Sequence, residues 1–371
     1  MFDRSKLEAL RAKYAQSKEI DVAPEALKKP LSVVLEEGNR RAIPFAGVST
    51  LLDAPFRPEA VDAPNFGGLD VALLGIPMDL GVTNRSGARF GPRAVRAIER
   101  IGPYNHVLKV APRGECMVAD IGDVPLRSRF SLESAIEDIS GFYARMYAAG
   151  VRPLAVGGDH SVTYPILKVL GHDRPVGLVH IDAHCDTMGE IEDTKFHHGG
   201  PFRQAVLDGV LDPERTIQIG IRGSAEVFWG FSYEAGMTVV HIEEVAKSGI
   251  DNVIRQARHV VGDGPTYISF DVDGIDPAFA PGTGTPEAGG LTPREAQAIL
   301  HGLRGLDIVG GDVVEVAPQY DPTTNTAMVG AQMLFEIFSL TVLGRRFKRR
   351  DASLLARASR LFGSLAPGEK T

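Results

Sequence analysis

From Asp70 onward, apolar runs of strand length alternate with segments of helix length, and this alternation limits the possible fold more than any other feature. The runs assigned to strands are Val71–Ile76, Pro153–Val156, Val176–Asp182, Thr216–Gly220, Thr238–His241, Thr266–Asp271 and Ile308–Val316. Helices are expected between them, for example at Leu132–Ala149, Ser161–Leu170, Ile250–Val261 and Pro293–Leu303. Because the strands are apolar nearly throughout, both of their faces should be buried. We therefore predict a three-layer α/β/α fold with a central parallel sheet of about eight strands.

Two segments flank this main domain, for which we expect the limits 61–345. Residues 1–60 form an N-terminal extension with two expected helices, Ser5–Gln16 and Leu31–Glu37, the second of them starting at Pro30. Residues 346–371 form a basic tail, and a cluster of basic residues from Arg345 to Arg350 marks its start. Such a tail more often forms a solvated helix or a subunit contact than a segment that binds a specific partner.

Composition excludes several classes of protein. The formal net charge of -7 argues against nucleic acid as the main partner, because phosphate binding needs a basic surface. No apolar run approaches the roughly 20 residues of a membrane span, and the charged segment Met1–Leu10 does not resemble a signal peptide. The two cysteines, Cys116 and Cys185, cannot form a disulfide framework and suit a reducing compartment. We therefore expect a cytoplasmic protein without a membrane or nucleic-acid partner.

Acidic and imidazole side chains follow the predicted strand that starts at Val176. Asp182, His184 and Asp186 are spaced at i, i+2 and i+4, so in an extended chain their side chains would point to one side. Two carboxylates and an imidazole crowded together repel and desolvate one another. A bound cation is the simplest compensation.

Two further clusters follow predicted strands in the same way. Asp271 and Asp273 come after one strand, and His160 in Gly157-Gly-Asp-His160 comes after another. Taken singly, each cluster also fits an ordinary turn, a loop or a helix cap. In a parallel sheet, however, ligands collect beyond the carboxyl ends of the strands. The three clusters together therefore indicate one metal site.

These motifs resemble those of the ureohydrolase (arginase and agmatinase) family, and most closely its agmatinase and guanidinobutyrase branch. The motifs are Gly157-Gly-Asp-His160, Asp182-Ala-His-Cys-Asp186, Ser269-Phe-Asp-Val-Asp-Gly-Ile-Asp-Pro277 and Asn84-Arg-Ser-Gly-Ala-Arg-Phe-Gly-Pro92. The resemblance runs from about residue 43 to about residue 343. It implies two metal ions, one held by His160, Asp182, Asp186 and Asp271 and the other by His184, Asp182, Asp271 and Asp273. Manganese is usual in the family and nickel occurs, and the mostly oxygen ligand set suits manganese.

The resemblance also implies two residues that act on the substrate. Glu315, in Asp312-Val-Val-Glu-Val-Ala-Pro318, would hold a guanidinium group, since a carboxylate can accept two hydrogen bonds from it. His198 would carry the proton to the leaving amine. The sequence departs from the family's pattern nearby, where Gly200 and Pro201 follow.

The remaining histidines and cysteines are expected to have structural roles. We expect His180 to be packed within its strand and His197 to be an ordinary loop residue. Cys185 should be a buried thiol directed away from the metal ligands, and Cys116 should lie on a strand.

The implied activity is hydrolysis of a small guanidino compound to urea and an amine. Agmatine is the first expectation, followed by guanidinobutyrate or guanidinopropionate, and then by guanidine or methylguanidines if the N-terminal extension narrows the pocket. In the loop Thr187–Lys195, the acidic residues Glu190, Glu192 and Asp193 would suit an ammonium end, whereas Lys195 would suit a carboxylate end.

Alternatives of other kinds are a catalytically silent partner subunit and a single-metal deacetylase of a related fold. The resemblance further implies a homotrimer or homohexamer. The segment Ile43–Leu52 resembles a part of agmatinase-like enzymes that helps to close the entrance of the site, often from a neighbouring subunit.

Overall fold

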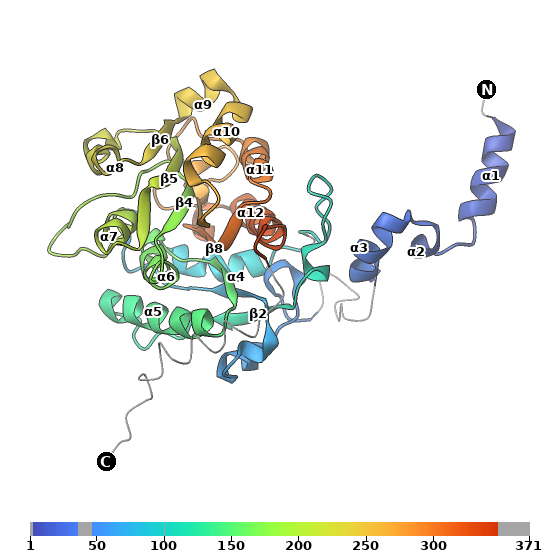
Figure 1. Cartoon of the computed structure of the whole chain (residues 1–371), viewed down its shortest axis with the longest axis horizontal. Coiled ribbons are helices and arrows are strands. Elements are labelled where there is room, and N and C mark those ends of the chain that lie inside the picture. The colour runs from blue at the N-terminus through green and yellow to red at the C-terminus, as the bar shows by residue number, and fades with distance from the viewer. Residues whose placement is uncertain (1–2, 36–46, 100, 348–371) are drawn as a thin grey trace, which may run out of the picture.

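A computed structural model describes residues 3–35, 47–99 and 101–347 of the chain. Its centre is one parallel sheet with the strand order β2-β1-β3-β8-β7-β4-β5-β6 (Figure 1). The strands are β1 Val71–Gly75, β2 Val118–Asp123, β3 Arg152–Val156, β4 Val176–Ile181, β5 Leu211–Ile221, β6 Thr238–His241, β7 Pro265–Asp271 and β8 Asp307–Val314. This eight-stranded parallel sheet confirms the predicted fold class.

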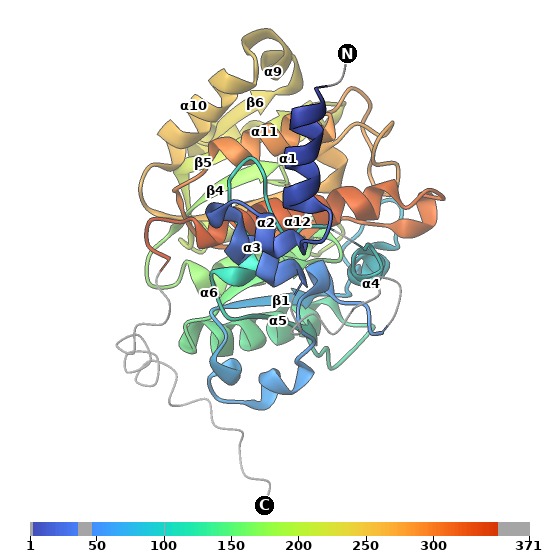
Figure 2. The ribbon, with the colours of Figure 1, turned by 90° about the vertical axis from the view of Figure 1, so that its right-hand side faces the viewer.

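Helices cover both faces of the sheet, as Figures 1 and 2 show. The α-helices of the main domain are α4 Gly91–Arg96, α5 Leu132–Ala148, α6 Thr163–Leu170, α7 Pro201–Leu207, α8 Gly230–Ala235, α9 Ile242–Ser248, α10 Ile250–Val261, α11 Pro293–Gly302 and α12 Asn325–Val342. In β1, Val71 and Leu73 belong to the hydrophobic core that includes α10, α11 and α12, whereas Ala72 and Leu74 belong to the core that includes α5, α6 and α7. Alternate side chains therefore enter two different cores, which explains why the strand sequences are apolar throughout.

The predicted strands are all present, and an eighth that was not predicted, β2, pairs with β1. Its sequence contains Asp120 and Asp123, which interrupt the apolar run. Cys116 was wrongly expected on a strand: it is buried, but it lies two residues before β2 begins. β8 ends at Val314, earlier than expected, because Glu315 adopts a φ of +63° that a strand cannot continue through.

The N-terminal extension forms α1 Arg4–Tyr14, α2 Glu19–Val22 and α3 Glu25–Leu35. The prediction of α1 is confirmed, but the predicted start of the second helix is wrong, because α3 begins at Glu25 and contains Pro30. Neither α1 nor α2 has a buried residue, and α1 lies away from the main domain in Figure 1. A contact of 2.7 Å between Lys29 Nζ and Glu115 Oε1 links α3 to the domain.

Some predicted segments lie outside the described residues, namely residues 36–46 of the extension and residues 348–371 of the basic tail. Leu51 and Leu52, at the end of the expected entrance segment, are buried in the core, and the Leu51 N–H donates to Asp120 Oδ2 at 2.8 Å. Within the described ranges, no helix combines the length and apolar character that a membrane span requires.

Candidate metal centre

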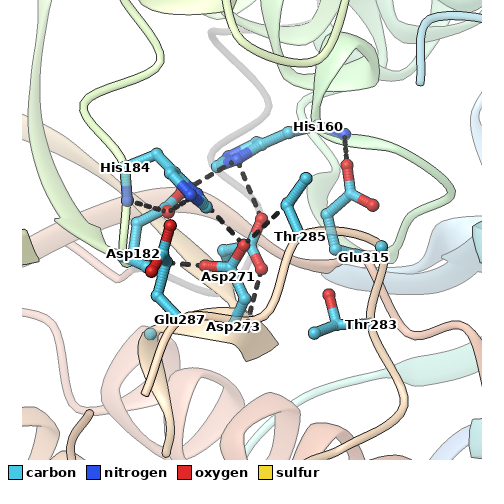
Figure 3. Close-up of polar contacts among 12 residues, drawn as sticks. His160, Asp182, His184, Asp271, Asp273, Thr283, Thr285, Glu287 and Glu315 are labelled. Carbon is cyan, nitrogen blue, oxygen red and sulfur yellow. Dashed lines mark hydrogen bonds and ion pairs between the residues drawn. The ribbon is translucent and has the colours of Figure 1, made fainter. Parts of the chain in front are cut away.

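Four neighbouring strands carry the predicted site. β3, β8, β7 and β4 are adjacent in the middle of the sheet. His160 lies four residues beyond the end of β3, Glu315 directly follows β8, Asp271 ends β7 and Asp182 directly follows β4. Because the strands are parallel, these positions meet at one edge of the sheet (Figure 3).

His160 faces three carboxylates. Its Nδ1 atom lies 3.2 Å from Asp182 Oδ2, 2.9 Å from Asp186 Oδ2 and 3.3 Å from Asp271 Oδ2. The nitrogen is fully buried, yet it is not oriented for a hydrogen bond with any of these oxygens. A ring nitrogen and three oxygens that converge in this way resemble the ligand shell of one cation.

A second group forms around His184. Its Nδ1 atom lies 3.1 Å from Asp273 Oδ2 and 3.4 Å from Asp182 Oδ1. The two oxygens of Asp182 therefore face different histidines. The structure brings all six predicted metal-ligand residues together, in two groups that share Asp182.

The charges of these groups are unbalanced without a cation. Burial and the charges of Asp273 and Asp182 raise the pKa of Asp271 well above its usual value. Burial opposes protonation of His160 and His184, but the surrounding carboxylates still raise the pKa of each imidazole well above its usual value. Divalent cations would supply the positive charge that this site otherwise obtains only by binding protons.

Turns in the backbone, rather than an extended chain, bring these carboxylate and imidazole side chains together. The expected alternation along residues 182–186 is wrong, because the backbone bends after β4 and Asp186 has a φ of +51°. Asp273 lies in a 3-10 turn, Val272–Gly274. Asp271 Oδ1 caps this turn by accepting a hydrogen bond from the Asp273 N–H at 2.8 Å. A Cβ atom at Gly274 would lie 2.9 Å from Asp182 N, so only glycine lets these two turns approach.

Glu315 and His198 lie together beside the two groups. Glu315 Oε1 accepts a hydrogen bond from the His160 backbone N–H and lies 2.9 Å from His198 Nδ1. Glu315 Oε2 is buried and has no hydrogen-bond partner among the residues that the structure describes. Burial lowers the pKa of His198, but the charge and hydrogen bond of Glu315 outweigh this effect and raise the pKa to about 9.

Polar residues behind the site hold His160 in place. His160 Nε2 lies 2.8 Å from Ser269 Oγ, and Ser269 Oγ donates to Asp312 Oδ1 at 2.6 Å. Asp312 Oδ2 also accepts hydrogen bonds from Thr163 Oγ1 and Tyr267 Oη. Such outer contacts orient a ligand imidazole. They were not predicted, although a buried aspartate within the apolar run of β8 was a visible signal.

His180 also differs from its expected role. It is fully buried, as expected, but its Nε2 atom lies 2.7 Å from Asp182 Oδ2 rather than among apolar groups alone. His197, expected to be an ordinary loop residue, is buried as well, and its Nε2 atom lies 2.7 Å from the carbonyl oxygen of Gly189.

A pocket of about 490 Å³, open to solvent, leads to the site. Its lining residues are Thr83, His184, Cys185, Asp186, Thr187, Met188, His198, Gly199, Ala225, Phe228, Trp229, Asp271, Asp273 and Thr285. The titratable groups in this lining belong to the two histidine–carboxylate groups, His198 and the Cys185 thiol, and the other lining residues are uncharged. Cys185 is buried, as expected, but it lines the pocket rather than turning away from it.

The loop charges that were expected to choose the substrate do not line this pocket. Glu190, Glu192, Asp193 and Lys195 are all exposed, and Lys195 Nζ lies 5.0 Å from the centre of the Phe196 ring. These charged groups are therefore solvated on the loop surface.

The fold and the site together have the arrangement of a metal-binding α/β/α protein, with paired histidine–carboxylate groups at the carboxyl edge of the sheet. Residues 69–339 match the arginase family, and the chain belongs to that family. The chain is 50% identical over 300 residues to a guanidinopropionase of Pseudomonas aeruginosa, covering 80% of this chain and 92% of that protein. It is 46% identical over 295 residues to a mitochondrial agmatinase of Gallus gallus, covering 78% of this chain and 85% of that protein.

A solved structure with the same fold is that of proclavaminate amidino hydrolase from Streptomyces clavuligerus. The TM-score is 0.74 at 33% sequence identity, and the match covers 81% of this chain and 99% of that chain. These comparisons confirm the predicted family, branch and fold, and they establish the protein as a hydrolase.

Proposed function

We propose that this chain hydrolyses a small linear guanidino compound to urea and an amine, with two divalent metal ions, and that a guanidino acid is its preferred substrate. The observation that carries the proposal is the buried Oε2 atom of Glu315, which lacks a partner within the described ranges. It lies at the same sheet edge as the two histidine–carboxylate groups (Figure 3). A guanidinium cation is the ligand whose N–H groups match such an oxygen.

The six clustered residues are proposed as the metal ligands. His160, Asp182, Asp186 and Asp271 would hold one ion, and His184, Asp182, Asp271 and Asp273 the other. Four carboxylates and two imidazoles favour manganese, with nickel as the alternative. When bound, such a pair of ions would lower the pKa of a water molecule toward neutral and so supply a hydroxide nucleophile.

Glu315 positions the substrate in this proposal. Its Oε1 atom is already engaged by His160 and His198, so Oε2 is the atom left for the guanidinium. The approach to Oε2 is kept open by Gly284, where a Cβ atom would lie 3.6 Å from Oε2 and 2.8 Å from the carbonyl oxygen of Arg85. The fixed carboxylate then directs the guanidino carbon toward the metal groups.

His198 moves the proton that the leaving amine requires. Its Nδ1 atom donates to Glu315 Oε1, so Nε2 is the nitrogen that gains and loses a proton. In the neutral ring Nε2 accepts from the Thr83 N–H at 3.2 Å, and in the protonated ring it can donate to Thr83 Oγ1 at 2.6 Å. His198 also lines the pocket, so it can reach a bound substrate.

A guanidino acid takes first place over agmatine because the guanidinopropionase is 50% identical to this chain. The loop charges do not separate the two substrates, since neither the acidic residues nor Lys195 lines the pocket. Agmatine is the second candidate, favoured by 46% identity to the agmatinase. Guanidine has less support, since none of the pocket-lining residues comes from α1, α2 or α3.

Urea release from a panel of guanidino compounds tests the proposal. The protein is loaded with manganese, and separately with nickel, and offered guanidinopropionate, guanidinobutyrate, agmatine, arginine and guanidine. We expect the highest kcat/KM with one of the two acids. A higher kcat/KM with agmatine would change the substrate class, and no urea from any compound would contradict the activity. That last result would favour a silent partner subunit, whereas one zinc ion per chain would favour the deacetylase alternative.

Three further proposals remain. The homotrimer or homohexamer rests on the resemblance, the cytoplasmic location rests on the cysteine count and the charged N-terminal segment, and the division into an extension at 1–60, a catalytic domain at 61–345 and a basic tail at 346–371 rests on the sequence pattern. Sedimentation of the full chain and of a chain that starts at residue 61 would test the assembly and the first boundary.

A further inference from the structure

We propose that His180 is a positioning residue for the metal centre and not a metal ligand: it holds the shared carboxylate of Asp182 by donating a hydrogen bond, and Gln218 fixes the tautomer that makes this possible. The inference rests on the metal centre proposed above. His180 could be mistaken for a ligand, because its ring nitrogen lies within 4.8 Å of ligand atoms of His160, Asp182 and Asp186.

The orientation of the Gln218 amide is fixed by its contacts. Its Nε2 atom lies 2.5 Å from the carbonyl oxygen of Cys185, which can only accept a hydrogen bond, so the atom at this position must be nitrogen. The same nitrogen lies 3.2 Å from His180 Nδ1. An amide nitrogen carries two hydrogens, so one goes to Cys185 and the other to His180.

The tautomer of His180 follows from that contact. Nδ1 accepts from Gln218, so it carries no hydrogen, and a neutral imidazole then carries its proton on Nε2. The Nε2–H group lies 2.7 Å from Asp182 Oδ2 and donates to it. A protonated Nε2 has no lone pair to offer a metal ion, which excludes the role of ligand.

The sheet itself holds this pair. His180 on β4 lies directly opposite Gln218 on β5 in the strand register, and both side chains are fully buried. The Phe202 ring packs on His180 with 4.4 Å between ring centres. Strand register and packing therefore hold the two side chains against each other.

These contacts fix the orientation of the Asp182 carboxylate, which is proposed to bridge the two metal ions. Asp182 Oδ1 accepts from the His184 backbone N–H at 2.6 Å, and Oδ2 accepts from His180. Each oxygen therefore has one donor of its own while it faces one metal group, and the carboxylate cannot rotate away from either. Removal of such an outer contact costs roughly 10- to 100-fold in metal affinity.

Manganese titration of the metal-free full-length protein tests the inference. The variants are His180→Leu, which removes the donor, His180→Gln, whose amide can place an N–H near the position of Nε2, and Gln218→Met, which frees the tautomer. The exposed His172→Gln is the matched control. Thermal unfolding of each metal-free variant identifies any that fail to fold.

We expect two ions per chain in the wild type. His180→Leu should still bind two ions at saturation, but about 10- to 100-fold more weakly, with His180→Gln close to the wild type and Gln218→Met in between. Loss of one ion at saturation in both His180 variants would show that His180 is a ligand, and unchanged affinity in all of them would remove its role. Both results overturn the inference, whereas a wild type that binds no manganese overturns the metal centre itself.

If His180→Leu fails to fold, nitrogen NMR of histidine-labelled wild type decides the matter. We expect a buried histidine with a proton on Nε2 and none on Nδ1, whose signals change in Gln218→Met. The opposite tautomer would overturn the inference.

Discussion

Glu315 Oε1 lies 2.9 Å from His198 Nδ1, and this contact joins the residue proposed to hold the substrate to the residue proposed to move the proton. The same oxygen accepts the backbone N–H of His160 at 2.9 Å. One carboxylate thus fixes an imidazole and the turn that carries the proposed ligand His160, while its second oxygen stays available. The φ of +63° at Glu315 is the local strain that places it there.

Glu315→Gln should lower kcat/KM by roughly 10- to 100-fold, because a charged acceptor for the guanidinium becomes a neutral amide. The manganese content should remain at the wild-type level, since Glu315 is not among the proposed ligands. Kinetics and metal analysis of the same preparation check both statements. Undiminished kcat/KM would mean that another group binds the guanidinium.

His198→Asn should lower kcat by about 10²- to 10⁴-fold, the usual contribution of a positioned acid or base. The Glu315 carboxylate raises the pKa of His198 to about 9, so the protonated form is lost as the pH rises through that value. Bound divalent ions would lower this pKa, so the alkaline limb of the wild-type pH profile should lie at or below pH 9. A profile with the same alkaline limb in His198→Asn would assign that limb to a different group.

Asp182→Asn should lose both ions, because Asp182 faces His160 with one oxygen and His184 with the other. Asp273→Asn should lose mainly the ion of the His184 group, since His184 is the histidine that Asp273 approaches among the described residues. Metal content after dialysis separates the two variants. An Asp182→Asn protein that retains two ions would show that the carboxylate is not shared.

Ser269→Ala should weaken metal binding by roughly 10-fold or more, since it removes the group that links the His160 ring to Asp312. Asp312→Ala should in addition destabilise the fold by about 1–3 kcal/mol, because it leaves buried hydroxyl donors without an acceptor. Manganese titration and urea unfolding measure the two effects. Equal manganese affinity in Ser269→Ala and wild type would contradict the linking role.

The sequence was sufficient to predict the layered fold and the clustering of the six residues proposed as metal ligands. Both predictions depend on patterns that any parallel sheet must obey, namely apolar strands and polar residues just beyond their carboxyl ends. β2 was missed because its stability depends on a distant partner: Arg96 donates to the buried Asp120 at 2.8 Å, which makes an aspartate acceptable within that strand.

The details of the site depend on contacts that spacing does not reveal. The turn of Val272–Gly274, the positive φ of Asp186 and the pairing of His180 with Gln218 all require knowledge of neighbouring elements. The direction of the charged side chains in the loop at residues 187–195 likewise depends on how the loop packs in the folded protein. The substrate preference expected from those charges therefore had no structural support.

Anomalous diffraction from crystals of the manganese-loaded protein tests the central claim most directly. We expect two manganese peaks per chain, one bonded to His160 Nδ1 and the other to His184 Nδ1, with Asp182 bonded to both. A single peak, or a manganese ion bonded to His180, would contradict the arrangement of ligands proposed here.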